Sequence, residues 1–252
     1  MKTDLRDMTF LIPIRIDSIM RLENLILSVQ SLLKNFDTHI TVLEASSYPN
    51  GILKKMLGDK VEYRFVEDKD PVFYRTKYLN DMTRRSCTSY IGIWDADVII
   101  PKEQILDSII KLRQGVEIAY PYDGHFYDTS VVIRELYAQN RNIRFLLKNT
   151  AKMSLIYGDK MKGGAMLVNK EAYIRAGMEN EKFYGWGPED FERYERWKIL
   201  DLKIYHSEGP LFHLTHSRGS NSTFRSMEQA INTNKEFSLT KFSSKAELSL
   251  EL

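Results

Sequence analysis

Three pairs of side chains in this sequence have the residue types and the close spacing that catalysis or metal binding requires. Two of the pairs are carboxylates, which can hold a cation or accept a proton, and the third consists of histidines, which are common metal ligands. The pairs are Asp95 and Asp97, Glu189 and Asp190, and His213 and His216. Each pair could also be purely structural, so the surrounding sequence has to decide.

Asp95 and Asp97 follow the apolar run Tyr90–Trp94, which lacks clean alternation and is therefore expected to be a central strand covered on both faces. In an extended segment residues i and i+2 point to the same side, so we expect both carboxylates to lie together at the strand's end. Two such carboxylates repel each other unless a cation joins them, and hard oxygen ligands suit Mg²⁺ or Mn²⁺. Such a cation would neutralise the diphosphate of a nucleotide sugar. The pattern alone also occurs by chance in many proteins.

Glu189 and Asp190 begin a predicted helix directly after an aromatic, glycine-rich loop around Trp186. The glycines beside Trp186 leave its indole open as an apolar platform for a sugar ring, whose hydroxyls need acceptors such as these two carboxylates. The alternative is that the acidic pair complements the helix dipole and that Trp186 only packs. The glycine pair Gly163 and Gly164 precedes the next predicted strand upstream, and we include it among the substrate-binding candidates.

His213 and His216 lie in and just after a predicted strand, Pro210–Thr215. Either histidine could complete a metal site with Asp97. In a regular strand two residues three apart face opposite ways, so both can bind one ion only if the backbone turns. A hydrogen-bonded structural role is the alternative for either side chain.

Three basic residues are candidates for contact with a nucleotide. Arg15 follows the predicted strand Thr9–Ile14, at the carboxyl end where open α/β sheets place their ligands. Arg75 and Lys77 lie on a basic amphipathic helix predicted over Tyr74–Arg85 and could reach a diphosphate. A solvated basic face is the alternative reading of that helix.

The elements that would position these residues alternate between strand and helix patterns, which indicates an α/β protein. Residues 122–162 have a weaker pattern, and there Val131–Leu147 is interpreted as a helical, mobile insertion or acceptor-side element. A loop is predicted over 217–222, a helix over Thr223–Phe237, and a frayed tail over 238–252. The further predicted strands are 39–43, 61–66, 117–121, 165–168 and 202–206, and the further helices are 22–33, 51–57 and one beginning at Pro101.

Composition bounds the class of protein. The chain has 252 residues, 43% of them hydrophobic, and a formal net charge of +2, which suit a globular protein without a dedicated nucleic-acid surface. Its single cysteine, Cys87, excludes an intrachain disulfide and fits a reducing compartment. No apolar run is long enough for a signal peptide or a transmembrane segment, so we expect a cytoplasmic protein, with peripheral contact at the inner face of the membrane left open.

The combined motifs resemble the β-1,4-galactosyltransferase group and its bacterial relatives, including the galactosyltransferase-like half of chondroitin-type polymerases. From Phe10 to about Arg218 the pieces follow the family's order: FLIPIR, RTKYLN, WDADV, GGAMLVNKEAYIRAG, FYGWGPED and HLTH. The resemblance implies a GT-A fold, with a mixed, mostly parallel central sheet flanked by helices. It also implies metal-dependent transfer of a sugar from a UDP-sugar with inversion.

The resemblance also implies roles for single residues on the nucleotide side. Arg15 and Arg75 would hold the diphosphate, and Asp97 and His216 would bind Mn²⁺ (or Mg²⁺). His213 stands where the family has its third metal ligand, often a methionine, and Asp95 would lie close to the ion.

On the sugar side, Trp186 would contact the sugar, Glu189 would position substrate, and Asp190 would be the catalytic base. Two departures from the family affect specificity. Phe191 interrupts the family's acidic run, which concerns the acceptor, and Met161 stands at a position linked to donor choice, which leaves galactose and N-acetylgalactosamine both open.

These features together predict a bacterial polysaccharide enzyme that uses a UDP-sugar donor and a saccharide or lipid-linked oligosaccharide acceptor. One GT-A domain is expected over 1–237, with a nucleotide-sugar-binding part (1–121) and an acceptor-side part (122–222). One alternative is a nucleotide-sugar- or glycan-binding protein without catalysis. Another is a sugar nucleotidyltransferase, although FLIPIRIDS lacks the glycine-rich phosphate loop that such an enzyme would need.

Overall fold

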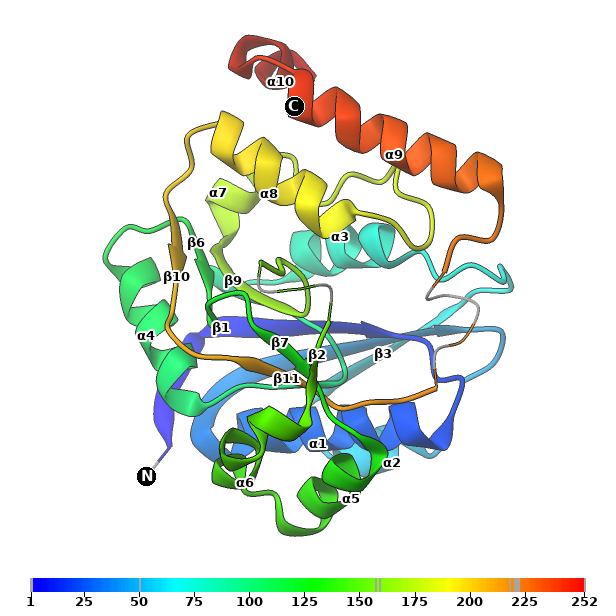
Figure 1. Ribbon diagram of the computed structural model, residues 1–252, viewed down its shortest axis with the longest axis vertical. Coiled ribbons are helices and arrows are strands. Elements are labelled where there is room, and N and C mark those ends of the chain that lie inside the picture. The colour runs from blue at the N-terminus through cyan, green and yellow to red at the C-terminus, as the bar shows by residue number, and fades with distance from the viewer. Residues whose placement is uncertain are drawn as a thin grey trace.

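A seven-stranded mixed sheet forms the centre of the protein, in the strand order β10-β6-β9-β4-β1-β2-β3 (Figure 1). The computed structural model describes residues 2–49, 51–156, 158, 160–217, 219 and 223–251. Neighbouring strands are parallel except that β9 runs antiparallel to both β4 and β6. The strands are β1 (Thr3–Ile14), β2 (Phe36–Ser46), β3 (Glu62–Glu67), β4 (Tyr90–Trp94), β6 (Ile118–Tyr120), β9 (Ala165–Asn169) and β10 (Ile204–His206).

Helices cover both faces of this sheet, with α1 on one side and α3 and α8 on the other (Figure 1). The α/β class with a mostly parallel sheet is therefore confirmed. The helices are α1 (Ile19–Asn35), α2 (Leu53–Leu57), α3 (Arg75–Arg85), α4 (Lys102–Arg113), α5 (Val131–Asn140), α6 (Ile143–Lys148), α7 (Lys170–Arg175), α8 (Glu189–Ile199), α9 (Met227–Phe242) and α10 (Lys245–Glu251), with a 3₁₀ turn η1 (Thr150–Lys152).

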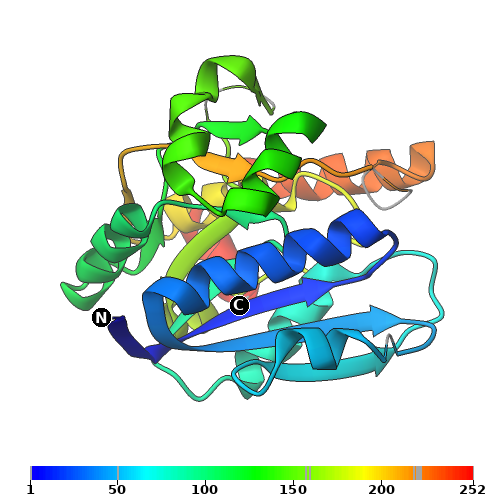
Figure 2. The ribbon, with the colours of Figure 1, turned by 90° about the horizontal axis from the view of Figure 1, so that it is seen from below.

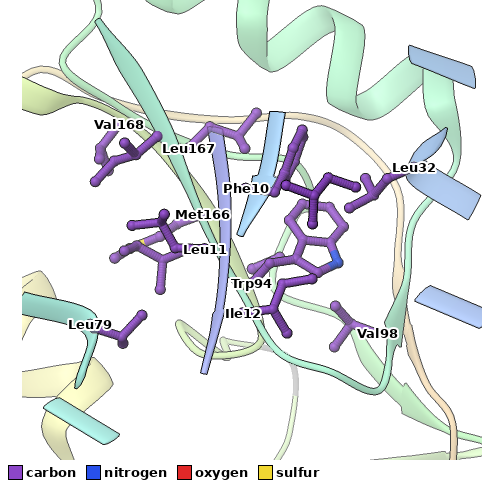
Figure 3. Packing of buried hydrophobic residues seen from close by; sticks show 14 of the residues in the cluster. Phe10, Leu11, Ile12, Leu32, Leu79, Trp94, Val98, Met166, Leu167 and Val168 are labelled. Carbon is purple, nitrogen blue, oxygen red and sulfur yellow. The ribbon is translucent and has the colours of Figure 1, made fainter. Parts of the chain in front are cut away.

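The core around β1 and β4 fixes the strand that carries the two aspartates. Phe10 packs edge-to-face on Trp94, with ring centroids 5.2 Å apart, and both are fully buried (Figure 3). Gly92 makes this possible, because a Cβ at that position would lie 2.6 Å from the Phe10 ring. The Trp94 indole N–H donates to Ser28 Oγ on α1 at 3.2 Å. The end of β4, just before Asp95, is thus held by packing against β1 and by a hydrogen bond to α1.

A second, four-stranded sheet joins distant parts of the chain, in the order β5-β11-β7-β8. Its edge strand β5 pairs antiparallel with β11, with Phe212 opposite Ile99 and His213 opposite Val98. This ladder brings the segment after Asp97 beside the histidine segment. The strands are β5 (Val98–Ile99), β7 (Phe126–Asp128), β8 (Ser154–Leu155) and β11 (Leu211–His213).

The region predicted as one mobile helical insertion consists of two packed helices, α5 and α6. The chain breaks between them at Arg141, whose φ is 50°. On α5, the guanidinium of Arg134 is fully buried and donates to Asn24 Oδ1 at 2.8 Å and to Glu23 Oε2 at 2.6 Å. Leu146 of α6 is also fully buried. These contacts fix the helix pair against α1, and its acceptor-side role stays a prediction.

The prediction of a frayed tail from residue 238 is wrong for residues 238–251. Helix α9 continues to Phe242, and α10 follows. Thr240 is buried and donates to Glu192 Oε1 on α8 at 2.8 Å, and Leu248 is buried as well. The Ser/Lys/Glu-rich composition concealed these contacts because only a few of the residues face the body.

The division at residue 121 into a nucleotide part and an acceptor part stays a prediction. The central sheet does not follow this division, because β9 and β10 come after residue 121 and still belong to it. The predicted loop over 217–222 lies largely outside the described residues. Within the described chain, no helix combines the length and the apolar character needed to cross a bilayer.

Candidate active site

A pocket of about 490 Å³ lies where β4 and β11 end and where β9 and α8 begin. Most of the candidates from the sequence line it together, although they come from distant parts of the chain. Trp186, Phe224 and Phe126 supply aromatic surface beside the carboxylates. The predicted site residues in its wall are Asp95, Asp97, Gly163, Gly164, Trp186, Glu189, Asp190, His213 and His216.

Asp97 and the two histidines form one compact cluster in this pocket. Asp97 Oδ2 lies 3.0 Å from His216 Nε2 and 3.6 Å from His213 Nε2, and the three possible ligand atoms lie within 4.8 Å of one another. The cluster forms because β11 ends at His213 and the chain then leaves the strand, with the Leu214 N–H donating to the Asp97 carbonyl at 2.7 Å. The turn that both histidines require is therefore present.

The other nitrogen of each ring is held by an oxygen. His213 Nδ1 lies 2.8 Å from Asp128 Oδ1, and His216 Nδ1 lies 2.9 Å from the Ser217 carbonyl. Because these oxygens accept hydrogen bonds, each Nδ1 donates and each Nε2 is directed toward Asp97. Carboxylate or carbonyl partners of this kind orient the histidines of metal sites.

Asp97 and the histidines stabilise one another's charged forms. Burial alone would raise the pKa of Asp97, but the two histidines outweigh it and hold that pKa well below its usual range. Burial would lower the pKa of His213, but Asp97 and Asp128 raise it to about 9. The guanidinium of Arg21 lies 3.8 Å from Asp97 Oδ2. The site is thus built around an anionic carboxylate that attracts positive charge.

This donor set fits a divalent cation, and it fits Mn²⁺ better than Mg²⁺. One carboxylate oxygen and two imidazole nitrogens converge, whereas Mg²⁺ is usually held by oxygen alone. Three protein ligands also leave coordination positions for oxygens of a bound nucleotide.

The extended backbone expected through Asp95 and Asp97 is wrong, because β4 ends at Trp94 and the chain turns at residues 96–97. Asp95 accepts a hydrogen bond from Arg75 Nη2 at 2.7 Å, while Asp97 faces the histidines. The Asp95 backbone N–H donates to the Gly164 carbonyl at 2.8 Å. Both aspartates still line one pocket, but only Asp97 belongs to the metal cluster.

Asp190, in the first turn of α8, lies between two guanidinium groups. Arg193 Nη2 donates to Asp190 Oδ1 at 2.7 Å, and Arg75 Nη1 lies 3.9 Å from the same oxygen. Arg193 is itself buried, and its Nη1 donates to both carboxylate oxygens of Glu179 at 2.7 and 2.6 Å. Burial would raise the pKa of Asp190, but Arg193 and Arg75 outweigh it and lower that pKa. Asp190 is therefore ionised at neutral pH.

The glycine pair makes room for these groups. A Cβ on Gly163 would lie 2.4 Å from Asp190 Oδ2, so only glycine leaves space for this oxygen. Gly164 has φ +82°, and a Cβ there would lie 2.5 Å from the ring of Phe126. Both glycines thus shape the pocket wall, and direct contact with substrate stays a prediction for them.

Glu189 presents a buried oxygen without a partner. Among the described atoms, nothing forms a hydrogen bond with its Oε2. Burial and the neighbouring Asp190 charge raise the pKa of Glu189 to about 8. Trp186 beside it packs edge-on against Phe224, with ring centroids 4.7 Å apart. A buried polar atom of this kind in a pocket is suited to bond a ligand hydroxyl.

The three basic candidates have different surroundings. Arg75 reaches the carboxylates of the pocket, and its buried Nη1 has no hydrogen-bond partner among the described atoms. Arg15 donates to Asp68 Oδ2 at 2.6 Å and to two backbone carbonyls, outside the pocket wall. Lys77 is exposed, with its ammonium group 5.9 Å from the Tyr74 ring centroid. Their contacts with a diphosphate stay predictions.

Sequence reasoning missed several residues of this site. Arg193 could have been found, because it stands three residues after Asp190 on one helix face. Asp128 and Arg21 carry no such local signal, since strand pairing and helix packing alone bring them to the histidines and to Asp97.

Comparisons with known proteins concern the family and the fold of this chain. Residues 149–218 match the family model described as the N-terminal domain of galactosyltransferase. The catalytic domain of Drosophila β1,4-galactosyltransferase 7, in complex with xylobiose, superposes with a TM-score of 0.59 at 15% identity, covering 97% of this chain and 83% of that one. A mutant of the same enzyme, in complex with manganese, UDP-Gal and xylobiose, gives 0.55 at 15% identity, over 90% and 78% of the two chains.

A more distant structure has the same fold. Glucosyl-3-phosphoglycerate synthase from Mycobacterium tuberculosis, in complex with Mn²⁺, UDP and phosphoglyceric acid, gives a TM-score of 0.52 at 11% identity, covering 84% of this chain and 72% of that one. A search of curated protein sequences finds no significant match. The structural neighbours are glycosyltransferases of the GT-A fold, and the GT-A fold expected from the sequence is confirmed.

Proposed function

We propose that this chain, galactosyltransferase-like in its matched family and GT-A in fold, is a metal-dependent inverting transferase acting on a UDP-sugar. It would transfer galactose or N-acetylgalactosamine to a saccharide hydroxyl. One observation supports this most strongly: the Asp97, His213 and His216 cluster and the ionised Asp190 face a single pocket. A cation site and a proton acceptor are the two groups that such a transfer needs.

Asp97, His213 and His216 would hold Mn²⁺, which when bound supplies positive charge to the diphosphate. The anomeric C–O bond to UDP breaks, and UDP leaves with the electron pair. Asp190 accepts the proton of the acceptor hydroxyl as its oxygen forms the new bond on the opposite face of the sugar. General-base assistance of this kind is typically worth about 10² to 10⁴ in rate.

The remaining pocket residues would hold the two sugars in place. Glu189 Oε2 has no partner among the described atoms and would bond a sugar hydroxyl, and Trp186 would cover an apolar face of a ring. Arg75, held by Asp95, would approach the diphosphate through its unbonded Nη1. Positioning of this kind removes part of the entropic barrier to reaction.

The biological setting is a finer part of the proposal. The Drosophila enzyme binds UDP-Gal, manganese and xylobiose, which supports a galactose-type donor and a saccharide acceptor here. We further propose a role in bacterial surface polysaccharide synthesis, with a saccharide or lipid-linked oligosaccharide as acceptor. For this role we propose a cytoplasmic location, which is compatible with peripheral contact at the inner face of the membrane.

Calorimetry with UDP, with and without Mn²⁺, followed by a UDP-release assay over a panel of UDP-sugars, tests the proposal. We expect Mn²⁺-dependent UDP binding and turnover with UDP-galactose or UDP-N-acetylgalactosamine. Tight UDP binding without turnover on any donor would instead indicate a binding protein without catalysis. Pyrophosphate release from UTP and a sugar phosphate would indicate a nucleotidyltransferase.

A further inference from the structure

A second groove, of about 740 Å³, lies between α1, the start of α4 and the turn that joins α5 to α6. It shares no lining residue with the active-site pocket. Figures 1 and 2 both show α5 and α6 beside α1. The polar and charged residues in its wall are Gln30, Ser31, Lys34, Asn35, Lys102, Glu103, Asn140, Arg141, Asn142 and Arg144.

The charge of this groove is positive and largely uncompensated. Of its four cationic residues, Lys102 alone has a carboxylate nearby, that of Glu103 at 4.0 Å. No carboxylate of the described chain lies within 4 Å of the charged nitrogens of Lys34, Arg141 or Arg144. A groove lined by cationic side chains that lack carboxylate partners attracts an anionic ligand.

The groove also contains hydrogen-bonding groups suited to hydroxyls. Its wall includes four side-chain amides. Those of Asn35, Asn140 and Asn142 each form a hydrogen bond within the protein, whereas Gln30 has a buried Oε1 without a hydrogen-bond partner among the described atoms. A hydroxyl can both donate and accept, so it would satisfy Gln30 in either orientation of the amide. The unpartnered amide therefore favours a polyhydroxyl ligand over a simple anion.

The backbone at Arg141 supports a role for its side chain. This residue ends α5 with φ 50° and ψ 37°, the left-handed conformation for which glycine or asparagine is usual. An arginine there is conformationally unfavourable, so the chain keeps a cation in the groove wall at some expense of stability.

We propose that this groove binds an acidic saccharide, through its cations at carboxylate or phosphate groups and through its amides at hydroxyls. The source of the saccharide rests on the proposed function, because a transferase acting on such a chain would meet it as acceptor or product. Helix α1 connects the two sites, from Arg21 in the active-site pocket to Lys34 in the groove. At 1.5 Å per residue the two lie about 20 Å apart along the helix. An extended chain could therefore engage both.

Binding of hexagalacturonic acid, measured by calorimetry in EDTA without any UDP-sugar, tests this inference apart from catalysis. Maltohexaose is the uncharged comparison, and tripolyphosphate and anionic phospholipid vesicles are the anions without sugar. We expect hexagalacturonate to bind, to weaken as salt is added, and to bind at least tenfold better than the other three probes.

The variant Arg141→Asn/Arg144→Gln should weaken hexagalacturonate binding at least tenfold. Asparagine at 141 suits the left-handed backbone, so the fold should be retained. The matched control is Lys148→Gln/Lys152→Gln, which removes the same charge from exposed neighbours that do not line the groove. This control should change the affinity less than twofold, and Mn²⁺-dependent UDP binding should be unchanged in both variants.

Several outcomes would overturn the inference. These are an absence of hexagalacturonate binding, equal binding of maltohexaose, an equal loss in the Lys148/Lys152 control, or tighter binding of tripolyphosphate or vesicles. Failure of the proposed function has a different signature. If no UDP-sugar is turned over but the groove variant still loses hexagalacturonate binding, the acidic-saccharide site stands and the transferase proposal does not.

Discussion

The substitution Gly163→Ala tests whether the free oxygen of Asp190 has to occupy its observed position. The new Cβ would lie 2.4 Å from Asp190 Oδ2. An ordinary contact is about 3.5 Å, so the carboxylate must move by about 1 Å. Misplacement of a catalytic group by about 1 Å can reduce the rate about 10²-fold, which corresponds to about 2.7 kcal/mol in the activation barrier.

The assay is UDP release with donor and acceptor, reported as kcat/KM, together with calorimetry of Mn²⁺–UDP binding and thermal unfolding. We expect kcat/KM to fall about 10²-fold. Nucleotide binding and the unfolding temperature should change little, because Gly163 has no left-handed backbone to strain. The control is Gly51→Ala, whose Cβ would have no atom of the described, non-adjacent residues within 4 Å. If Gly163→Ala retains full activity while Asp190→Asn is inactive, the close approach does not determine the position of the base.

Three further predictions concern the same pocket. Asp190→Asn should reduce turnover by about 10² to 10⁴ while Mn²⁺–UDP binding persists, and near-normal transfer by this variant would exclude Asp190 as the base. Exhaustive dialysis against EDTA, or the variants Asp97→Asn and His216→Ala, should abolish Mn²⁺-dependent UDP binding in calorimetry, and full activity in excess EDTA would remove the metal from the scheme. The pKa of Glu189, raised to about 8, means that the ligand-free folded protein holds a proton which the unfolded chain loses above about pH 4.5. Stability should therefore fall as pH rises from 5 to 8, and Glu189→Gln should flatten that fall in thermal unfolding; equal slopes would contradict the burial argument.

Sequence patterns predicted the elements of the fold well where each has a strong local signal. Tyr90–Trp94 is a strand with the predicted bounds, and the helix predicted over 22–33 lies within α1. The family resemblance is confirmed by the galactosyltransferase match and by the GT-A neighbours. The second sheet could not be predicted from such patterns, because β5 and β8 contain only two residues each and form through long-range pairing.

The candidate site was predictable in its residues but not in its geometry. Asp97, His213 and His216 meet as the metal hypothesis required, yet Asp95 turns away because the strand stops one residue before it. The prediction that Asp95 and Asp97 face the same side assumed that the strand continues through them. No residue pattern indicated that β4 ends at Trp94. Arg15 follows its strand as predicted, but its guanidinium bonds Asp68, a tertiary contact without a local signal.

The short pairing of β11 with β5 would make an apolar residue important for the proposed metal site. Successive side chains of a strand alternate between its two faces, so a slip of one position would turn His213 to the opposite face. Phe212, fully buried in the small hydrophobic cluster beneath α5 and α6, opposes such a slip because it would have to leave that cluster. A defect in manganese binding could thus arise from a substitution at Phe212, a residue that has no ligand atom.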